Sequence, residues 1–237
     1  MLNAQPAPPS AMPDASRPNV RLVKRGAGIT DSFRVLAQLT DEGKRSGIVH
    51  KETALALGGK MAGKARVPER NGRLEIAALR RHVRGNVRYK HDPHLVDTYE
   101  SADRVLELGT ADCDGQTVLL ASMAQSAGYP VAFRAISTRP DGKFNHVYPL
   151  VEVAPGEWLA ADTTVDSALG WETSGITRSK TVGIADDRLT PWVASGHAPP
   201  DIGNGADSAS SSRGLLYAIL AVAALVLGPR LLARAGI

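Results

Sequence analysis

The chain has 237 residues, of which 43% are hydrophobic and 22% are charged, and its formal net charge is +4 at pH 7. This length allows one domain of ordinary size with something left over, and the composition excludes a wholly disordered chain. The single cysteine excludes an intramolecular disulfide and any zinc site that needs two thiolates. The mild positive charge permits an anionic membrane surface as a neighbour, but it does not argue for specific binding of nucleic acid.

Proline, alanine and serine dominate residues 1–19. Such a segment cannot bury enough apolar surface to offset the entropy of ordering it, so we expect a disordered arm. It is not a signal peptide, because no apolar run follows a basic start. Residues 20–70 give weaker signals, which predict a short strand at 19–23 and two helices, over 31–39 and 50–57. We expect residues 20–70 to pack on the outside of the main domain.

Residues 71–182 carry the organised pattern of the main domain. Asn71 can cap a helix that ends at His91-Asp-Pro-His94, because the residue before a proline is pushed out of the helical region. The patterns that follow predict helices over 102–108 and 113–127, then strands over 131–137, 145–153 and 157–164. Two helices followed by consecutive strands with short turns argue for an α+β fold with an antiparallel sheet.

Cys113 follows Asp112 at the predicted first turn of a helix. Free backbone N–H groups and the helix dipole favour a thiolate at this place, so we expect a lowered thiol pKa. A buried structural cysteine is the ordinary alternative, since free cysteines are among the most buried residues. The polar neighbours Asp112, Asp114 and Gln116 favour a turn that is exposed on one side.

A thiolate nucleophile needs a base, and the base needs a group that orients it. His146 lies near the start of the second predicted strand and Asp162 near the end of the third. If these strands form a hairpin that turns near Pro155-Gly156, the two residues lie almost opposite each other. Taken singly, His146 could be a structural histidine of the sheet whose hydrogen bonds are satisfied, and Asp162 could be a turn residue. With Cys113 they make a candidate triad.

The runs Gly109-Thr-Ala-Asp-Cys-Asp-Gly-Gln116, Asn145-His-Val-Tyr148 and Glu157-Trp-Leu-Ala-Ala-Asp-Thr-Thr164 resemble motifs of the transglutaminase-like superfamily, in particular its small, often phage-borne members. The resemblance covers about residues 71–172. It implies a papain-like core in which the nucleophile helix packs on an antiparallel sheet. It also implies that Cys113 is the nucleophile, His146 the base and Asp162 the orienting group.

Two features depart from the family pattern or leave it incomplete. The family usually has Gly-Asp before the cysteine, whereas this chain has Ala111-Asp112. The backbone N–H of Cys113 is one oxyanion donor, but no second donor is evident, and Gln116 is a poor candidate. We expect no cofactor and no metal site: His91-Asp-Pro-His94 has no third strong ligand nearby, so we interpret it as a turn.

The chain ends in a spacer and an apolar run. Residues 183–213 are rich in Gly, Pro and Ser and predict a flexible linker, and residues 214–228 carry no charge. Such a run is short for a full span of about 20 residues, but apolar residues continue after Arg230, which can snorkel. We expect a transmembrane helix over 214–234, and the flanking arginines do not settle its orientation. A helix buried against the domain or against an oligomer partner is the alternative.

The sequence therefore predicts a transglutaminase-like thiol enzyme that cleaves or transfers acyl groups at amide bonds of a peptide or protein substrate. We expect it to be membrane-associated through a single C-terminal anchor, with the catalytic domain in the cytoplasm, or to be a virion component. Hydrolysis and transfer share the first step, so the sequence leaves both open. The rival hypothesis is a catalytically silent module that serves as a phage structural or assembly protein.

Overall fold

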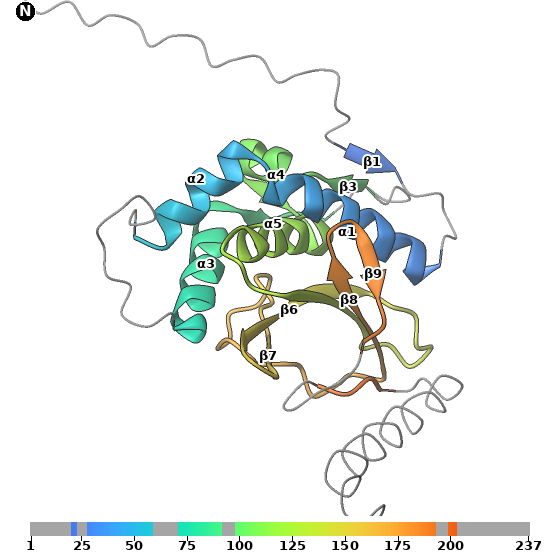
Figure 1. Cartoon of the computed structure of the whole chain (residues 1–237). Helices are drawn as coiled ribbons and strands as arrows, with labels where there is room; N and C mark the ends of the chain where they lie inside the picture. Colours follow the sequence, from blue (N-terminus) through green and yellow to red (C-terminus); the bar gives the residue numbers. More distant parts are fainter. Residues whose placement is uncertain (1–19, 23–27, 59–70, 92–97, 193–198, 203–237) are drawn as a thin grey trace, which may run out of the picture.

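The computed structural model of the protein describes residues 20–22, 28–58, 71–91, 98–192 and 199–202. These residues fold into a layer of helices packed on one face of a curved sheet (Figure 1). The helices are α1 (Ile29–Lys44), α2 (Gly47–Ala56), α3 (Gly72–Asn86), α4 (Ala102–Leu108) and α5 (Cys113–Ser126). The predicted combination of helices with an antiparallel sheet is confirmed.

The main sheet has five strands in the order β7-β6-β5-β8-β9, and every neighbouring pair is antiparallel. Its strands are β5 (Val131–Ser137), β6 (His146–Ala154), β7 (Glu157–Ala160), β8 (Arg178–Ala185) and β9 (Arg188–Thr190). Two smaller pairings join β1 (Val20–Leu22) to β3 (Thr98–Glu100), and β2 (Arg88–Tyr89) to β4 (Thr110–Ala111). Since the second of these is parallel, it lies outside the predicted antiparallel pattern.

The central strand β5 is buried along its whole length because both faces of the sheet are covered. Phe133 and Val131 belong to the core beneath the helices, whereas Ala132 and Ile136 belong to a second apolar cluster on the opposite face. Trp158 and Trp192 pack against this second cluster, with their rings edge to face. A strand covered on both faces is rich in apolar residues, and residues 131–136 are apolar except for the buried Arg134.

Helix α5 runs through the middle of the helical layer and packs against the other four helices and β6. Every residue from Gly115 to Ala124 is buried, which fits a helix surrounded by protein on all sides. The chain leaves α5 through Gly128, whose φ of +86° suits glycine. The predicted helix over 113–127 is therefore confirmed.

Side-chain caps begin the helices that the sequence predicted most clearly. Asn71 Oδ1 accepts the N–H of Leu74 at the start of α3, and Ser101 caps α4 in the same manner. Helix α3 ends at Asn86, before the predicted stop, because the chain next forms β2. The proline of His91-Asp-Pro-His94 lies outside the described residues.

The expectation that residues 20–70 pack outside the main domain is wrong for the helices it contains. Phe33 and Leu39 of α1 and Val49 of α2 are completely buried in the main core. Helix α1 packs along α5, and Phe33 stacks on Phe133 of β5. These helices supply one side of the core, so no domain boundary lies near residue 70.

The predicted linker over 183–213 is also wrong in its first part. Gly183–Ala185 complete β8 and pair with β9, and residues 199–202 are fixed to the same sheet. The Asp201 carboxylate accepts the Thr181 N–H at 3.0 Å and pairs with Arg134. The domain therefore includes residues up to Ile202. The predicted boundary at residue 182 would cut through β8.

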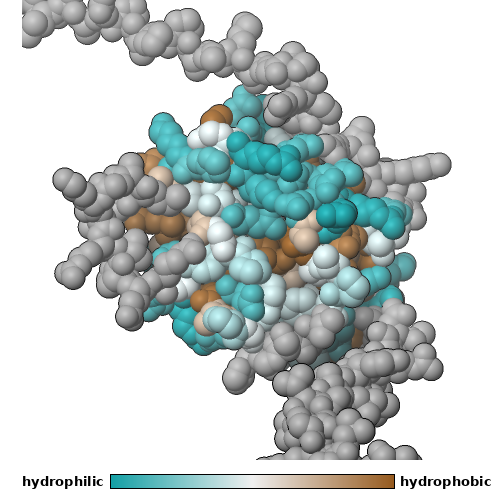
Figure 2. Space-filling view, viewed as in Figure 1, coloured by the Kyte–Doolittle hydropathy of each residue, from teal (hydrophilic) through white to brown (hydrophobic). Residues whose placement is uncertain are grey.

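The other predicted segments, 1–19 and 214–234, lie outside the described residues. Within the part of the chain that is described, no helix combines the length and the apolar character needed to cross a bilayer. On the face shown in Figure 2, hydrophilic side chains predominate over the helical layer, and exposed apolar groups are scattered. Exposed apolar side chains of the helices include Ile48 and Leu55 of α2 and Leu74 of α3.

Candidate active site

The N-terminus of α5 places Cys113 at the edge of a cavity. Asp112 is the N-cap of this helix, and its Oδ1 accepts the N–H groups of Asp114 and Gly115 at 3.0 and 3.1 Å. Just before the cap, Ala111 pairs with Tyr89 across the two short parallel strands. The turn is therefore held on both sides, and Cys113 is partly buried.

The electrostatic surroundings of Cys113 contradict the expected lowered pKa. Burial, then the charges of Asp114 and Asp112, raise the pKa of the Cys113 thiol well above its ordinary value. Cys113 Sγ also lies 3.6 Å from Asp114 Oδ1, to which the neutral thiol can donate. A hydrogen bond from the Val147 backbone acts in the opposite direction but does not outweigh these influences.

His146 and Asp162 form a direct hydrogen bond, with His146 Nε2 2.7 Å from Asp162 Oδ2. His146 begins β6, while β7 ends at Ala160 rather than at the predicted residue 164, so Asp162 lies in the loop that follows. Burial acts to raise the pKa of Asp162, but the hydrogen bond and charge of His146, with two hydrogen bonds from Thr164, lower it overall. Asp162 is therefore a buried carboxylate turned toward the imidazole.

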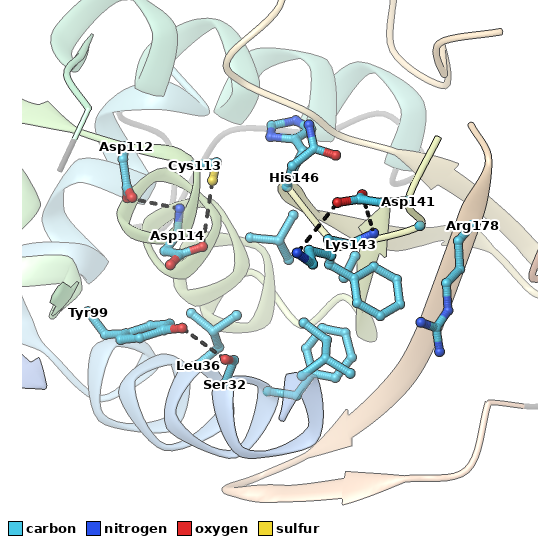
Figure 3. Close-up of a pocket in the computed structure, with 17 residues that line it drawn as sticks. Ser32, Leu36, Tyr99, Asp112, Cys113, Asp114, Asp141, Lys143, His146 and Arg178 are labelled. Atoms are coloured by element: carbon cyan, nitrogen blue, oxygen red, sulfur yellow. Dashed lines mark hydrogen bonds and ion pairs between the residues drawn. The ribbon is translucent and has the colours of Figure 1, made fainter. Parts of the chain in front are cut away.

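Cys113 and His146 line the same cavity because α5 packs on β6. Figure 3 shows Cys113 at the start of α5 and His146 on the neighbouring strand, facing the same hollow. The Thr117 hydroxyl donates to the Val147 carbonyl oxygen at 3.1 Å, which connects the two elements close to both residues. The structure thus places Cys113 and His146 on one cavity and His146 in hydrogen-bond contact with Asp162.

The cavity beside Cys113 has a volume of about 660 Å³ and is walled by segments far apart in the chain. Helix α1 contributes one wall, which includes Ile29 and Ser32, and Tyr99 donates to Ser32 Oγ at 2.9 Å. The loop before β6 contributes another wall, and Arg178 of β8, labelled in Figure 3, borders the cavity there. The Arg178 guanidinium lies over the ring of Phe144. The cavity therefore combines apolar side chains with acidic groups near the thiol.

A second hollow, of about 340 Å³, adjoins the His146–Asp162 pair. His146 lines both hollows, whereas Cys113 lines only the larger one. The second is bordered by Thr164 and by Trp171, whose side chain is 47% exposed. The hydrogen-bonded pair thus has open space on the side away from the thiol.

Gln116, the weak candidate for a second oxyanion donor, is turned into the protein. It is 1% exposed, and its side-chain amide donates to the Ala111 carbonyl oxygen at 3.4 Å. The backbone N–H of Cys113 remains the donor predicted from its place at a helix start.

One group of acidic and thiol ligand atoms lies close together within the described residues. One ligand atom each from Asp112, Cys113 and Asp114 falls within 4.8 Å of the others. This group is the start of α5 itself, and Asp112 is engaged as the helix cap. Nothing further in the described structure points to a metal there.

Sequence reasoning missed several residues of the site. Thr164 and Arg80 contact Asp162, and Ile29 borders the cavity from outside the segment that carries the resemblance. The signal for Arg80 was its place between Leu79 and Val83, on the buried face of α3. The contribution of α1 had no local signal, because it depends on packing between distant segments.

Comparison with known proteins agrees with the resemblance drawn from the motifs. Residues 60–163 match the family model of the transglutaminase-like superfamily. Comparison with curated proteins gives no match. A solved structure from Parabacteroides distasonis ATCC 8503, described as a "putative protease", shares 15% identity at a TM-score of 0.39 and aligns with 71% of this chain. The alignment covers 32% of that protein, so this chain spans about a third of its length. The matched segment includes Cys113, His146 and Asp162.

Proposed function

We propose that the protein is a thiol enzyme that cleaves or transfers acyl groups at amide bonds of a peptide or protein. Cys113 Sγ attacks the amide carbonyl while His146 takes the thiol proton, and His146 then gives that proton to the leaving amine. The C–N bond breaks and a thioester remains on Cys113, which water or a second amine resolves. Asp162 orients His146 throughout.

The observation that carries this proposal is the shared cavity. Cys113 and His146 line it together, and His146 is hydrogen-bonded to Asp162 at 2.7 Å. The nucleophile thus shares a cavity with the base, and the base is bonded to its orienting group, which is the arrangement that acyl transfer requires. The family match supports the same assignment.

The raised pKa of Cys113 decides how the nucleophile is activated. Because the pKa of the partly buried Cys113 thiol is raised, the neutral thiol is favoured, and we expect attack to begin from it. Proton transfer to His146 during the attack avoids that penalty, because the imidazolium compensates the developing thiolate. We therefore expect catalysis to depend more strongly on His146 than it would with a preformed thiolate.

The single cysteine makes the test unambiguous. A p-nitrophenyl ester should release a burst of p-nitrophenol and leave one acyl group on Cys113, measured by intact-protein mass. The His146→Ala variant should lose the burst rate by about 10²-fold or more, and Asp162→Asn should slow it as well. The control Cys113→Ser establishes the background. An acylation rate that is unchanged in His146→Ala would overturn the proposal.

A second candidate function is a catalytically silent module that serves in an assembly, such as a phage particle. The observation that favours it is the raised pKa of Cys113, since a thiol held neutral can be inert. The ester experiment separates the two. A silent module gives no burst, and its slow labelling by iodoacetamide is the same with and without His146.

We also propose that residues 214–234 tether the protein to a membrane, with the catalytic domain on the cytoplasmic side. The support is the uncharged run at 214–228. The full chain should remain in the membrane fraction after a carbonate wash, whereas a chain ending at Ile202 should be soluble. Full-length protein in the soluble fraction contradicts the tether. Protease accessibility in sealed vesicles tests the orientation.

A further inference from the structure

We propose that Thr164 and Arg80 are positioning residues for the proposed reaction: Thr164 fixes the Asp162 carboxylate, and Arg80 fixes the loop that carries it. The inference rests on the proposed function, in which Asp162 orients His146. It adds two residues that lie outside the Cys-His-Asp set.

Thr164 holds one oxygen of the Asp162 carboxylate with two hydrogen bonds. Asp162 Oδ1 accepts the Thr164 backbone N–H at 2.9 Å and the Thr164 hydroxyl at 2.7 Å. The other oxygen, Oδ2, is thereby directed to His146 Nε2 at 2.7 Å. The Thr164 hydroxyl also lies 3.4 Å from that nitrogen. This arrangement permits one orientation of the carboxylate.

The carboxylate needs this restraint because it lies beside open space. Asp162 follows the end of β7, so no pairing in the sheet fixes its own backbone position. The second hollow, of about 340 Å³, includes Asp162 and Thr164 in its wall. Without the Thr164 hydroxyl, the carboxylate could rotate toward water and lose its alignment with the imidazole.

Arg80 restrains the same loop from the opposite side. Its buried guanidinium donates to three backbone carbonyl oxygens: Asp162 from Nε at 2.5 Å, Ser167 from Nη1 at 2.7 Å and Val165 from Nη2 at 2.7 Å. A planar fork can satisfy three carbonyls that diverge in this manner, whereas a lysine ammonium cannot reach them together. The cation also favours the ionised form of Asp162, which lies within its electrostatic reach.

The experiment compares Thr164→Val with Thr164→Ser in the single-turnover ester reaction. Loss of the hydroxyl should slow acylation of Cys113 by about tenfold. This factor corresponds to the free energy that one hydrogen bond to a charged group contributes. Thr164→Ser should restore the rate. Thr173→Val is the matched control, because Thr173 lines the same hollow and is not bonded to Asp162. An unchanged rate in Thr164→Val overturns the inference.

A double-mutant cycle separates positioning from general damage. If Thr164 acts through Asp162, then Thr164→Val should cause no further loss in the Asp162→Asn background. Arg80→Lys should likewise cause no further loss of rate in the Asp162→Asn background. If Arg80→Lys does not fold, the Thr164 cycle alone tests the inference. Equal additional loss in both backgrounds overturns the inference. If Asp162→Asn is itself without effect, the proposed role of Asp162 fails first.

A carboxyl NMR titration tests the structural half independently of activity. Since the hydrogen bonds from Thr164 lower the pKa of Asp162, Thr164→Val should raise that pKa, and the acid limb of the rate profile should move to higher pH. Thr164→Ser should return both to their original positions. A pKa of Asp162 that is unaltered in Thr164→Val overturns the inference, even where no acylation is measured.

Discussion

Thr117 and Val147 join the helix of the proposed nucleophile to the strand of the proposed base. The Thr117 hydroxyl, one turn along α5 from Cys113, donates to the carbonyl oxygen of the residue after His146. Both residues are buried, so this hydrogen bond is shielded from competing water. This polar contact therefore fixes α5 against β6 close to both Cys113 and His146.

Replacing Thr117 by valine should weaken both folding and catalysis. The shape is nearly kept, but the Val147 carbonyl loses its donor, which should cost about 1–3 kcal/mol in the free energy of unfolding. The acylation rate should fall by more than this loss of stability explains, because α5 can shift against β6. Urea unfolding and the ester burst measure the two effects, with Thr117→Ser as the control. Wild-type acylation in Thr117→Val would show that packing alone aligns the site.

Removing the charge of Asp114 should make the Cys113 thiol more acidic. Asp114 is the larger of the two charged influences that raise the pKa of Cys113, so Asp114→Asn should lower that pKa. Below the pKa, a larger fraction of thiolate should then be present, and iodoacetamide should label Cys113 faster at neutral pH. The pH dependence of labelling measures the shift.

Asp141→Asn is the matched control for this prediction, since Asp141 lines the same cavity from the loop before β6. It is not among the main groups that set the pKa of the Cys113 thiol. An Asp114→Asn profile that coincides with wild type would mean that burial, the largest influence, sets the pKa alone.

The elements that the sequence predicted well have local determinants. Asn71 and Ser101 cap their helices by side-chain bonds to the N–H three residues on, and Gly128 ends α5. The run from Val131 to Ile136 is apolar except for Arg134, which fits a strand buried on both faces. Signals of this kind act within a few residues and are readable without knowledge of the fold.

The features that the sequence missed depend on distant partners. Asp201 belongs to the segment predicted as a linker, but it bonds to the buried Ser179 and Thr181 of β8, so this part of the segment is fixed to the sheet. The burial of Phe33 follows from stacking on Phe133, which no local pattern indicates. The pKa of Cys113 was predicted in the wrong direction for the same reason, since burial outweighs the local effect of the helix start.

Arg134 should be important for stability, because it is a buried cation with two anionic partners. Its side chain is 1% exposed and pairs with Glu172 at 2.8 Å and Asp201 at 3.3 Å. Arg134→Met should leave both carboxylates without this partner and reduce the free energy of unfolding by about 3–5 kcal/mol. Urea unfolding measures the loss. Glu172→Gln, which keeps the cation paired with Asp201, should lose less, and equal losses would contradict this account.

Truncation should place the end of the folding unit at Ile202. A chain that ends there keeps β9 and the contact in which Ile202 N–H donates to Ser179 Oγ at 2.7 Å, so it should unfold cooperatively. A chain that ends at Val182, the boundary expected from composition, leaves β5 without its partners Gly183 and Ile184 and removes β9. The second chain should therefore expose part of the sheet and both apolar clusters to water, and it should lack a cooperative transition.

Circular dichroism melts compare the unfolding of the two chains, and iodoacetamide labelling of Cys113 reports on the site. The thiol should react slowly in the longer chain and at the rate of an unfolded peptide in the shorter one. A cooperative melt with slow labelling in the chain that ends at Val182 would show that β9 and Asp201 are not needed for the core to form.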